Sequence, residues 1–183
     1  KGGTKAPVVV VLHGFELLAP EIYQGLIDHL NHQGYNVVFP AYNKGGFGIT
    51  NDTDQNAMLA RAVASTRSAI SALGSKADTS KVYLFGHSLG GLVAASWTGA
   101  GGIAPAGIVL ANPSTSGAAG IPDFLSGIVT VTPIPWQTKV PATRAPTVIL
   151  TGDNDTIAPP AEAIGLFDKL TSASSRSIYE LQG

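Results

Sequence analysis

A serine flanked by glycines lies between two segments of opposite character. The pentapeptide Gly86–Gly90, of the form Gly-x-Ser-x-Gly, follows the β-prone run 81–85 and precedes the small, apolar run 91–97. This context predicts a sharp turn from a strand into a helix, in which glycines allow close approach and a strained backbone. Such a turn holds the Ser88 hydroxyl where an acyl carbon can reach it. The alternative is a glycine-rich turn whose serine only caps the helix.

Composition indicates one globular domain spanning residues 1–183. Hydrophobic residues make up 44% of the chain and charged residues 13%, which argues against disorder. The net charge of −1 gives no electrostatic basis for binding nucleic acid or an anionic membrane. No apolar run has the length of a membrane span. The absence of cysteine excludes disulfides, thiolate metal sites and a cysteine nucleophile. Compartment and oligomeric state stay open.

Strand-like and helix-like segments alternate along the chain. This alternation predicts an α/β fold, with a mostly parallel sheet and helices on both faces. The segment 112–145, rich in Pro, Gly, Ser and Thr, is too long for a simple connection, and we expect a short lid or pocket wall there. The predicted strands are 7–12, 35–40, 81–86, 107–111, 147–151 and 177–181, and the predicted helices are 20–33, 54–73, 88–99 and 159–170.

A second motif follows the first strand directly. His13-Gly14-Phe15 lies at the strand's carboxyl end, and parallel strands bring those ends to the same rim as Ser88. The backbone N–H groups of Phe15 and Leu89 are therefore candidates for an oxyanion site. A polar turn at the strand end is the alternative. For the side chains of His13 and His87 we expect structural hydrogen bonds rather than chemistry.

An acid that orients a general base belongs after a later strand. The strand 147–151 leads into Gly152-Asp153-Asn154-Asp155, which places two carboxylates at the rim. Asp155 is the better candidate because the turn after Gly152 projects it back over the sheet. Asp153 is typical of ordinary loop chemistry. No acid follows the preceding strand, where Asn112-Pro113 stands instead.

The general base has no candidate in the expected place. The order Ser…Asp…His predicts a histidine after the last strand, but His13, His29 and His32 precede Ser88 and His87 adjoins it. His29 and His32 are expected to face solvent on the first helix. We expect the sequence to be cut at both ends, with the histidine lying beyond Gly183.

Apolar and aromatic side chains near the strand ends are candidates for a substrate pocket. The predicted lining is His13, Tyr42, His87, Trp136 and Ile157. Trp136 has the alternative role of plain core in the 112–145 segment. The histidines have no metal-ligand spacing with carboxylates, so we expect neither a metal nor another cofactor.

Three motifs together resemble those of the α/β-hydrolase superfamily, in particular its esterase, lipase and dienelactone-hydrolase-like branches. They are His13-Gly14-Phe15, the turn 86–91, and Gly152–Asp155 before Ile157-Ala158-Pro159. The resemblance covers nearly the whole chain. It implies that the acid in Gly-x-x-Asp is Asp155, and that a catalytic histidine follows Gly183 shortly.

Two functions remain open on the sequence. The first is a serine hydrolase that cleaves small-molecule carboxylic esters through Ser88, Asp155 and a histidine absent from this chain. The second is a non-catalytic α/β-hydrolase-like binding protein or inactive fragment. Within the first, thioesterase, amidase and peptidase chemistry share the same tetrahedral intermediate, so the motifs do not separate them.

Overall fold

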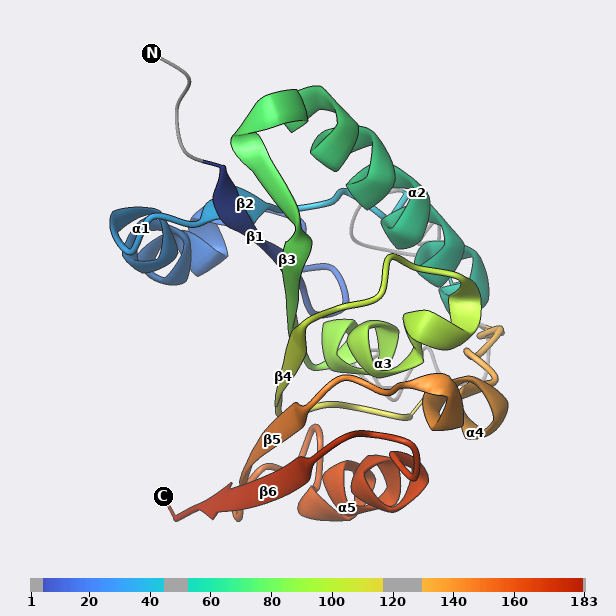
Figure 1. Cartoon of the computed structure of the whole chain (residues 1–183). Helices are drawn as coiled ribbons and strands as arrows, with labels where there is room; N and C mark the ends of the chain where they lie inside the picture. The colour runs from blue at the N-terminus through green and yellow to red at the C-terminus, as the bar shows by residue number, and fades with distance from the viewer. Residues whose placement is uncertain (1–4, 45–52, 117–129, 183) are drawn as a thin grey trace.

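A computed structural model describes residues 5–44, 53–116 and 130–182. Strands and helices alternate along these residues, as the sequence predicts (Figure 1). The strands are β1 (Ala6–Leu12), β2 (Asn36–Val38), β3 (Ala77–His87), β4 (Gly107–Ala111), β5 (Thr147–Gly152) and β6 (Arg176–Leu181). The α-helices are α1 (Gln24–His32), α2 (Gln55–Leu73), α3 (Leu89–Ser96), α4 (Trp136–Lys139) and α5 (Pro160–Lys169). Short 3₁₀ turns are η1 (Pro20–Tyr23), η2 (Gly74–Lys76), η3 (Thr98–Ala100) and η5 (Val140–Ala142).

All six strands form one parallel sheet in the order β2-β1-β3-β4-β5-β6. Because the strands run in the same direction, their carboxyl ends meet at one rim, where the loops after β1, β3, β4 and β5 lie together. The order reverses at β1, which pairs with β2 on one side and β3 on the other. The fold class predicted from the alternation is confirmed.

Helices flank the sheet on both faces (Figure 1). Helix α1 lies on one face, and α2, α3 and α5 lie on the other. The second face carries most of the core, because alternate side chains of the strands point into it. Leu84, Ile108 and Ile149 on this face are at most 2% exposed. Helix α3 is buried along its whole length, so it is the element that fixes the central turn against the sheet.

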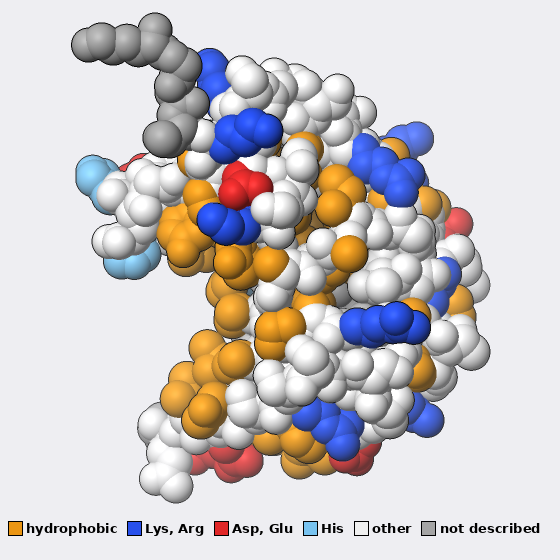
Figure 2. All heavy atoms as spheres, viewed as in Figure 1, with side chains coloured by type: hydrophobic (Ala, Val, Ile, Leu, Met, Phe, Trp, Pro, Cys, Tyr) orange, Lys and Arg blue, Asp and Glu red, His pale blue; other side chains and the backbone are white. Residues whose placement is uncertain are grey.

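On the other face, helix α1 covers only β1 and β2, and no described helix covers the remaining strands (Figure 1). In Figure 2 hydrophobic side chains line a hollow on this side of the molecule. The in-register side chains of Phe85, Val109 and Val148 are partly exposed there, and Tyr179 and Leu181 of β6 are each 56% exposed. Parallel sheets are normally covered on both faces, so this open face is a departure from the usual arrangement.

Several element boundaries differ from those predicted: β2 ends at Val38 rather than at residue 40, and α3 ends at Ser96 rather than at residue 99. The helix expected over 20–33 begins as the 3₁₀ turn η1 and becomes α-helical only at Gln24. Strand β3 starts at Ala77, four residues before the predicted start, because Ala77 and Asp78 pair with Ala6 and Pro7 of β1. The predicted cap of the second helix is confirmed, since the Asp54 carboxylate accepts the Ala57 N–H at 2.9 Å.

Residues 130–145 of the predicted lid segment pack against the core. Ile134 and Val140 are buried, and the Thr143 hydroxyl donates to the Ala95 carbonyl of α3 at 2.8 Å. Thr132 forms an isolated parallel bridge with Asp54 at the start of α2. Residues 117–129 lie outside the described part of the chain, so a lid or pocket wall there stays a prediction.

Candidate active site

Ser88 lies in the turn between β3 and α3, and its backbone is strained. Its φ of 53° and ψ of −121° are rare for a residue with a side chain. Two of its hydrogen bonds join the turn to β4 and the loop after it: the Ser88 N–H donates to the Ala111 carbonyl at 3.0 Å, and the Ser114 N–H donates to the Ser88 carbonyl at 3.1 Å. Ser88 occupies the N-cap position of α3, yet its side chain makes no capping hydrogen bond. The Ser88 side chain is therefore not used to cap the helix.

Glycines let the turn approach the sheet. A Cβ atom on Gly86 would lie 2.3 Å from the Gly90 carbonyl oxygen, and one on Gly90 would lie 2.1 Å from the Leu12 carbonyl oxygen. Both distances are far below van der Waals contact with backbone atoms, which cannot move aside cheaply. Helix α3 can thus start directly over the ends of β1 and β3 only because these positions have no side chain.

The loop after β1 lies beside the Ser88 turn. A Cβ atom on Gly14 would be 3.4 Å from the Ser88 Cβ and 3.3 Å from Nδ1 of His87. The backbone N–H groups of Phe15 and Leu89 form no hydrogen bond with any residue in the described part of the chain. Both therefore retain a free donor near Ser88, as the predicted oxyanion site requires.

Asp155 follows β5 and is held by three donors. Its Oδ1 accepts the N–H groups of Ile157 at 2.9 Å and Ala158 at 2.8 Å, and its Oδ2 accepts the Asn112 side-chain amide at 2.5 Å. Asp153 instead pairs its backbone N–H with the Leu181 carbonyl of β6 at 3.0 Å. Of the two acids, Asp155 is the one that lines the same cavity as Ser88.

Electrostatics keep Asp155 ionised and His87 neutral. Partial burial raises the pKa of Asp155, but the two backbone N–H donors, the Asn112 amide and the nearby His87 outweigh it, so the net pKa lies below its usual value. Burial lowers the pKa of His87, and the charge of Asp155 offsets this only in part. A carboxylate and a neutral imidazole therefore share one rim at neutral pH.

A cavity of about 220 Å³ brings these groups together. Of the predicted site residues, the structure places Ser88, Asp155, Phe15, His87 and Ile157 in its lining. Leu17, Asn112 and Ala158 complete the lining.

Three predicted pocket residues lie away from this cavity. His13 is fully buried, where its ring stacks on Tyr42 with centroids 4.0 Å apart and its Nδ1 hydrogen-bonds the Gly14 carbonyl at 2.7 Å. Tyr42 is 1% exposed, and its hydroxyl donates to the His13 carbonyl. Trp136 starts α4 and packs against the core. These positions support structural roles, because the apolar side chains expected in a pocket are used here to fill the interior beneath the rim.

From the sequence, no role in the site was assigned to three residues that have one in the structure. Asn112 has a φ of 41° and holds Asp155, and Glu162 accepts hydrogen bonds from the Ser114 hydroxyl and the Ser116 N–H at 2.9 and 3.0 Å. Tyr23 contacts both Gly14 and His87. Each acts on a partner distant in sequence, which a local pattern cannot reveal. The Asn112-Pro113 pair at a strand end was the only local hint.

Neither a metal cluster nor a membrane-spanning helix is found among the described residues. No group of three His, Cys, Asp or Glu side chains there has a geometry that could hold an ion. No described helix combines the length and apolar character needed to cross a bilayer. His29 and His32 are exposed on α1, as predicted.

Comparisons with known proteins agree with this architecture. A family model described as serine aminopeptidase, S33, matches residues 3–136. A monoacylglycerol lipase of Paleococcus ferrophilus is similar in structure, with a TM-score of 0.69 and 22% identity over 98% of this chain and 86% of that one. An esterase of Pyrococcus furiosus has a TM-score of 0.74 and 17% identity, over 100% of this chain and 75% of that one. Est1E of Butyrivibrio proteoclasticus, solved with ferulic acid, has a TM-score of 0.72 and 16% identity, over 99% of this chain and 81% of that one. The comparison with curated proteins gave no match.

The family match and the fold lead to the same assignment. The family model covers most of the chain, and at these identities the solved structures establish the fold they share with it. The chain belongs to the serine aminopeptidase S33 family of the α/β-hydrolase superfamily.

Proposed function

We propose that the chain carries the active site of a serine hydrolase that cleaves carboxylic esters. The observation that supports this most is the position of Ser88, which lies at a strained turn in a cavity shared with Asp155. A strained backbone persists only where the surrounding structure enforces it, and it is concentrated at functional sites. The junction has the features of a nucleophile elbow, and its serine is not used as a cap.

The proposed reaction proceeds through an acyl-enzyme. The Ser88 Oγ attacks the ester carbonyl carbon as a base removes its proton, and the resulting oxyanion accepts hydrogen bonds from the Phe15 and Leu89 N–H groups. Collapse of the tetrahedral intermediate breaks the carbonyl–alkoxy bond, and the base returns the proton to the departing alcohol. Water then attacks the Ser88 ester by the reverse route and releases the acid.

We assign the base to a histidine outside residues 1–183. Among the described residues no imidazole hydrogen-bonds Ser88 or Asp155, and Nδ1 of His87 is occupied by the Tyr23 hydroxyl. Asp155 is suited to orient such a histidine, because its three donors fix the carboxylate and favour its charged form.

The cavity walls favour small or flexible esters as substrates. Phe15, Leu17 and Ile157 supply apolar surface beside Ser88, and Ile157 is 69% exposed. The volume of about 220 Å³ is below the 300–1,000 Å³ typical of drug-sized ligands. In a series of p-nitrophenyl esters we therefore expect the rate to be highest for short acyl chains, and a maximum at long chains would contradict this.

Chemical rescue tests the proposed function on residues 1–183 themselves. Added imidazole is small enough for the cavity and can accept the Ser88 proton in place of a histidine. We expect imidazole to accelerate release of p-nitrophenol from the acetate ester beyond its own solution reaction. Ser88→Ala should abolish this excess and Asp155→Asn should reduce it at least tenfold, because the triad acts as a unit. An equal excess in Ser88→Ala would contradict the proposal.

A non-catalytic binding protein is the second candidate. It is favoured by one observation, that no described imidazole reaches Ser88. Binding of an ester or acid in the cavity without any turnover, in the presence of imidazole, would support this function over hydrolysis. Calorimetry with p-nitrophenyl acetate and with acetate separates the two, since only hydrolysis produces a continuing heat flow.

A further inference from the structure

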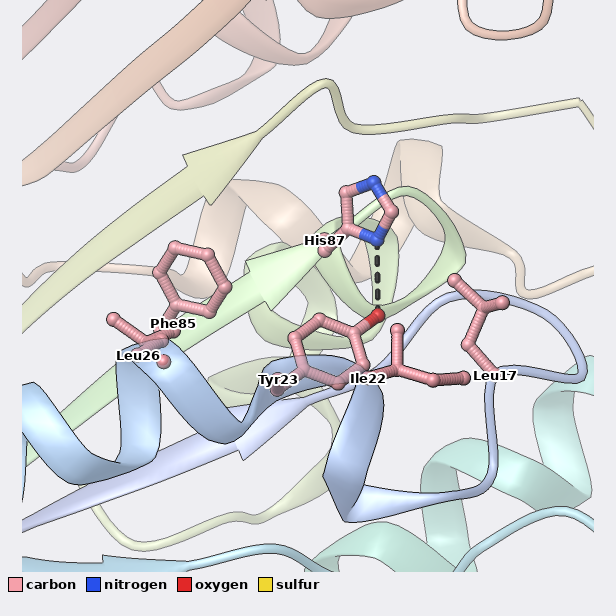
Figure 3. Close-up of a pocket in the computed structure, with 7 residues that line it drawn as sticks. Leu17, Ile22, Tyr23, Leu26, Phe85 and His87 are labelled. Atoms are coloured by element: carbon pink, nitrogen blue, oxygen red, sulfur yellow. Dashed lines mark hydrogen bonds between the residues drawn. The ribbon is translucent and has the colours of Figure 1, made fainter.

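Tyr23 lies between the two loops that carry the proposed oxyanion donors. It ends the 3₁₀ turn η1, on the face of the sheet covered by α1. In Figure 3 its hydroxyl points at the imidazole of His87, and Tyr23 lines a cavity of about 490 Å³ together with Leu17, Ile22 and Leu26. The ring also packs against Phe39, with centroids 5.7 Å apart. Both ends of the side chain are therefore restrained.

The Tyr23 hydroxyl makes two hydrogen bonds to residues far apart in sequence. It accepts the Gly14 N–H at 2.9 Å and pairs with Nδ1 of His87 at 3.0 Å. Gly14 directly precedes Phe15, and His87 directly precedes Ser88. One hydroxyl therefore joins the loop after β1 to the Ser88 turn, each at the residue next to a reacting group.

We propose that Tyr23 is a positioning residue that sets the distance between the two oxyanion donors and the Ser88 hydroxyl. This inference rests on the proposed function. Catalysis by hydrogen bonds to an oxyanion depends on donors that are held in place before the charge develops, and a shift of about 1 Å can cost about 100-fold in rate. Tyr23 touches neither substrate nor Ser88, so it acts through Gly14 and His87.

Proton accounting gives the direction of both bonds. The Gly14 N–H can only donate, so the Tyr23 oxygen accepts there. The single phenolic proton is then free for Nδ1 of His87, which accepts it when the imidazole is neutral with its proton on Nε2. The resulting chain, Gly14 N–H to Tyr23 O–H to Nδ1 of His87, satisfies all three groups.

The close approach of the two loops explains why a bridge is needed. A Cβ atom on Gly14 would point at the Ser88 turn and lie only 3.3 Å from Nδ1 of His87 and 3.4 Å from the Cβ of Ser88. Glu16, two residues on, has a φ of 58°. A loop with this backbone holds its position only when neighbouring groups restrain it. The Tyr23 hydroxyl supplies one such restraint through its hydrogen bonds to Gly14 and His87.

Tyr23→Phe removes the hydroxyl and keeps the ring, and Tyr179→Phe is the matched control, because Tyr179 lies 56% exposed on β6. Two readouts apply. The first is the ¹⁵N shifts of His87, which report the ring tautomer without any reaction. The second is the rate of Ser88 labelling by a fluorophosphonate at rising concentration, with imidazole present, which separates the maximal rate from the half-saturating concentration.

We expect Nδ1 of His87 to be unprotonated in the wild type and the tautomers to mix in Tyr23→Phe. The maximal labelling rate should fall on the order of tenfold in that variant, with the half-saturating concentration unchanged and the control unaffected. An unchanged labelling rate in Tyr23→Phe, or a proton on Nδ1 in the wild type, would overturn the positioning role. Wild-type protein that resists labelling at Ser88 would overturn the proposed function and this role with it, whatever the tautomer.

Discussion

The side-chain amide of Asn112 donates to Oδ2 of Asp155 at 2.5 Å and so joins the loop after β4 to the loop after β5. Asn112 has a φ of 41°, a conformation that asparagine tolerates better than most residues. The backbone conformation of Asn112 and its hydrogen bond to Asp155 are linked, because the left-handed backbone directs the side-chain amide toward the carboxylate. Asp155 is thus held by a neighbouring strand as well as by its own turn.

Replacing Asn112 separates these two roles. Asn112→Gly and Asn112→Ala both lose the amide, so the pKa of Asp155 should rise toward its usual value in either variant. Both must adopt the positive φ at this position, but only alanine has a Cβ atom that strains it, so the alanine variant should unfold about 1–2 kcal/mol more easily than the glycine variant. Urea denaturation and a ¹³C titration of the Asp155 carboxyl measure the two effects. Equal stability of the two variants would contradict the backbone argument.

Substitution by alanine should have opposite effects on stability at Gly90 and at Gly25. Gly90→Ala places a Cβ atom 2.1 Å from the Leu12 carbonyl oxygen, and we expect a loss of more than about 3 kcal/mol or a failure to fold. A Cβ atom on Gly25 in α1 meets nothing within 4 Å. Gly25→Ala should therefore raise the free energy of unfolding by about 0.4–1 kcal/mol, because alanine restricts the unfolded chain. Thermal unfolding of the two variants decides this, and a tolerated Gly90→Ala would contradict the packing of α3 on β1.

Glu162 ties the start of the 112–145 segment to α5. Its Oε2 accepts the hydroxyl of Ser114, which is fully buried, and the N–H groups of Thr115 and Ser116. Hydrogen bonds to a charged acceptor contribute about 1.5–3 kcal/mol, and Glu162→Ala should lower the free energy of unfolding by about that amount.

Glu21→Ala is the matched control for this prediction, since Glu21 is an exposed acid in the first turn of η1. It should change stability by less than about 0.5 kcal/mol. Similar losses in the two variants, measured by urea denaturation, would mean that the Glu162 bonds add nothing beyond a surface charge.

The buried His13 and the partly buried His87 make stability depend on pH. Burial lowers the pKa of both His13 and His87 below 6.5. Between the lowered pKa values and about pH 6.5 the unfolded chain binds more protons than the fold, so the free energy of unfolding rises with pH in that window. As the pH falls through the same window, the free energy of unfolding decreases by up to about 1.4 kcal/mol per pH unit for each proton that the unfolded chain binds in excess.

Urea denaturation between about pH 5 and pH 8 measures this slope. His87→Asn keeps a side chain able to accept from Tyr23 and removes one titrating group. The slope should decrease in this variant, and His13 should account for what remains. A wild-type stability that is flat across the window would contradict the burial of neutral imidazoles.

The sequence predicts the strands and helices well because each of them depends on residues that are close together in the chain. Apolar runs such as 107–111 have strand length and are bounded by turn residues, and the Asp54 cap marks the start of α2. Strand β3 was predicted too short because residues 78–81 are polar and lack the apolar pattern of a buried strand, whereas pairing of Ala77 and Asp78 with β1 defines the start of the strand.

The site was predictable only where it depends on strand ends. Ser88 directly follows β3 and Asp155 lies in the turn after β5, so a parallel sheet brings them to one rim. His13 and Tyr42 were predicted in the pocket, yet they stack on each other beneath it, since a strand end does not fix whether a side chain points up or down. Tyr23 and Glu162 had no signal, because their partners lie up to 64 and 48 residues away.

Labelling of Ser88 by a fluorophosphonate tests the central claim most directly. With imidazole present, intact mass spectrometry should show one added phosphonyl group, and peptide mapping should place it on Ser88. Ser88→Ala should take up none, while the fold, followed by circular dichroism, is unchanged. A wild-type protein that stays unmodified under conditions that label a known serine esterase would contradict the assignment of Ser88 as a nucleophile.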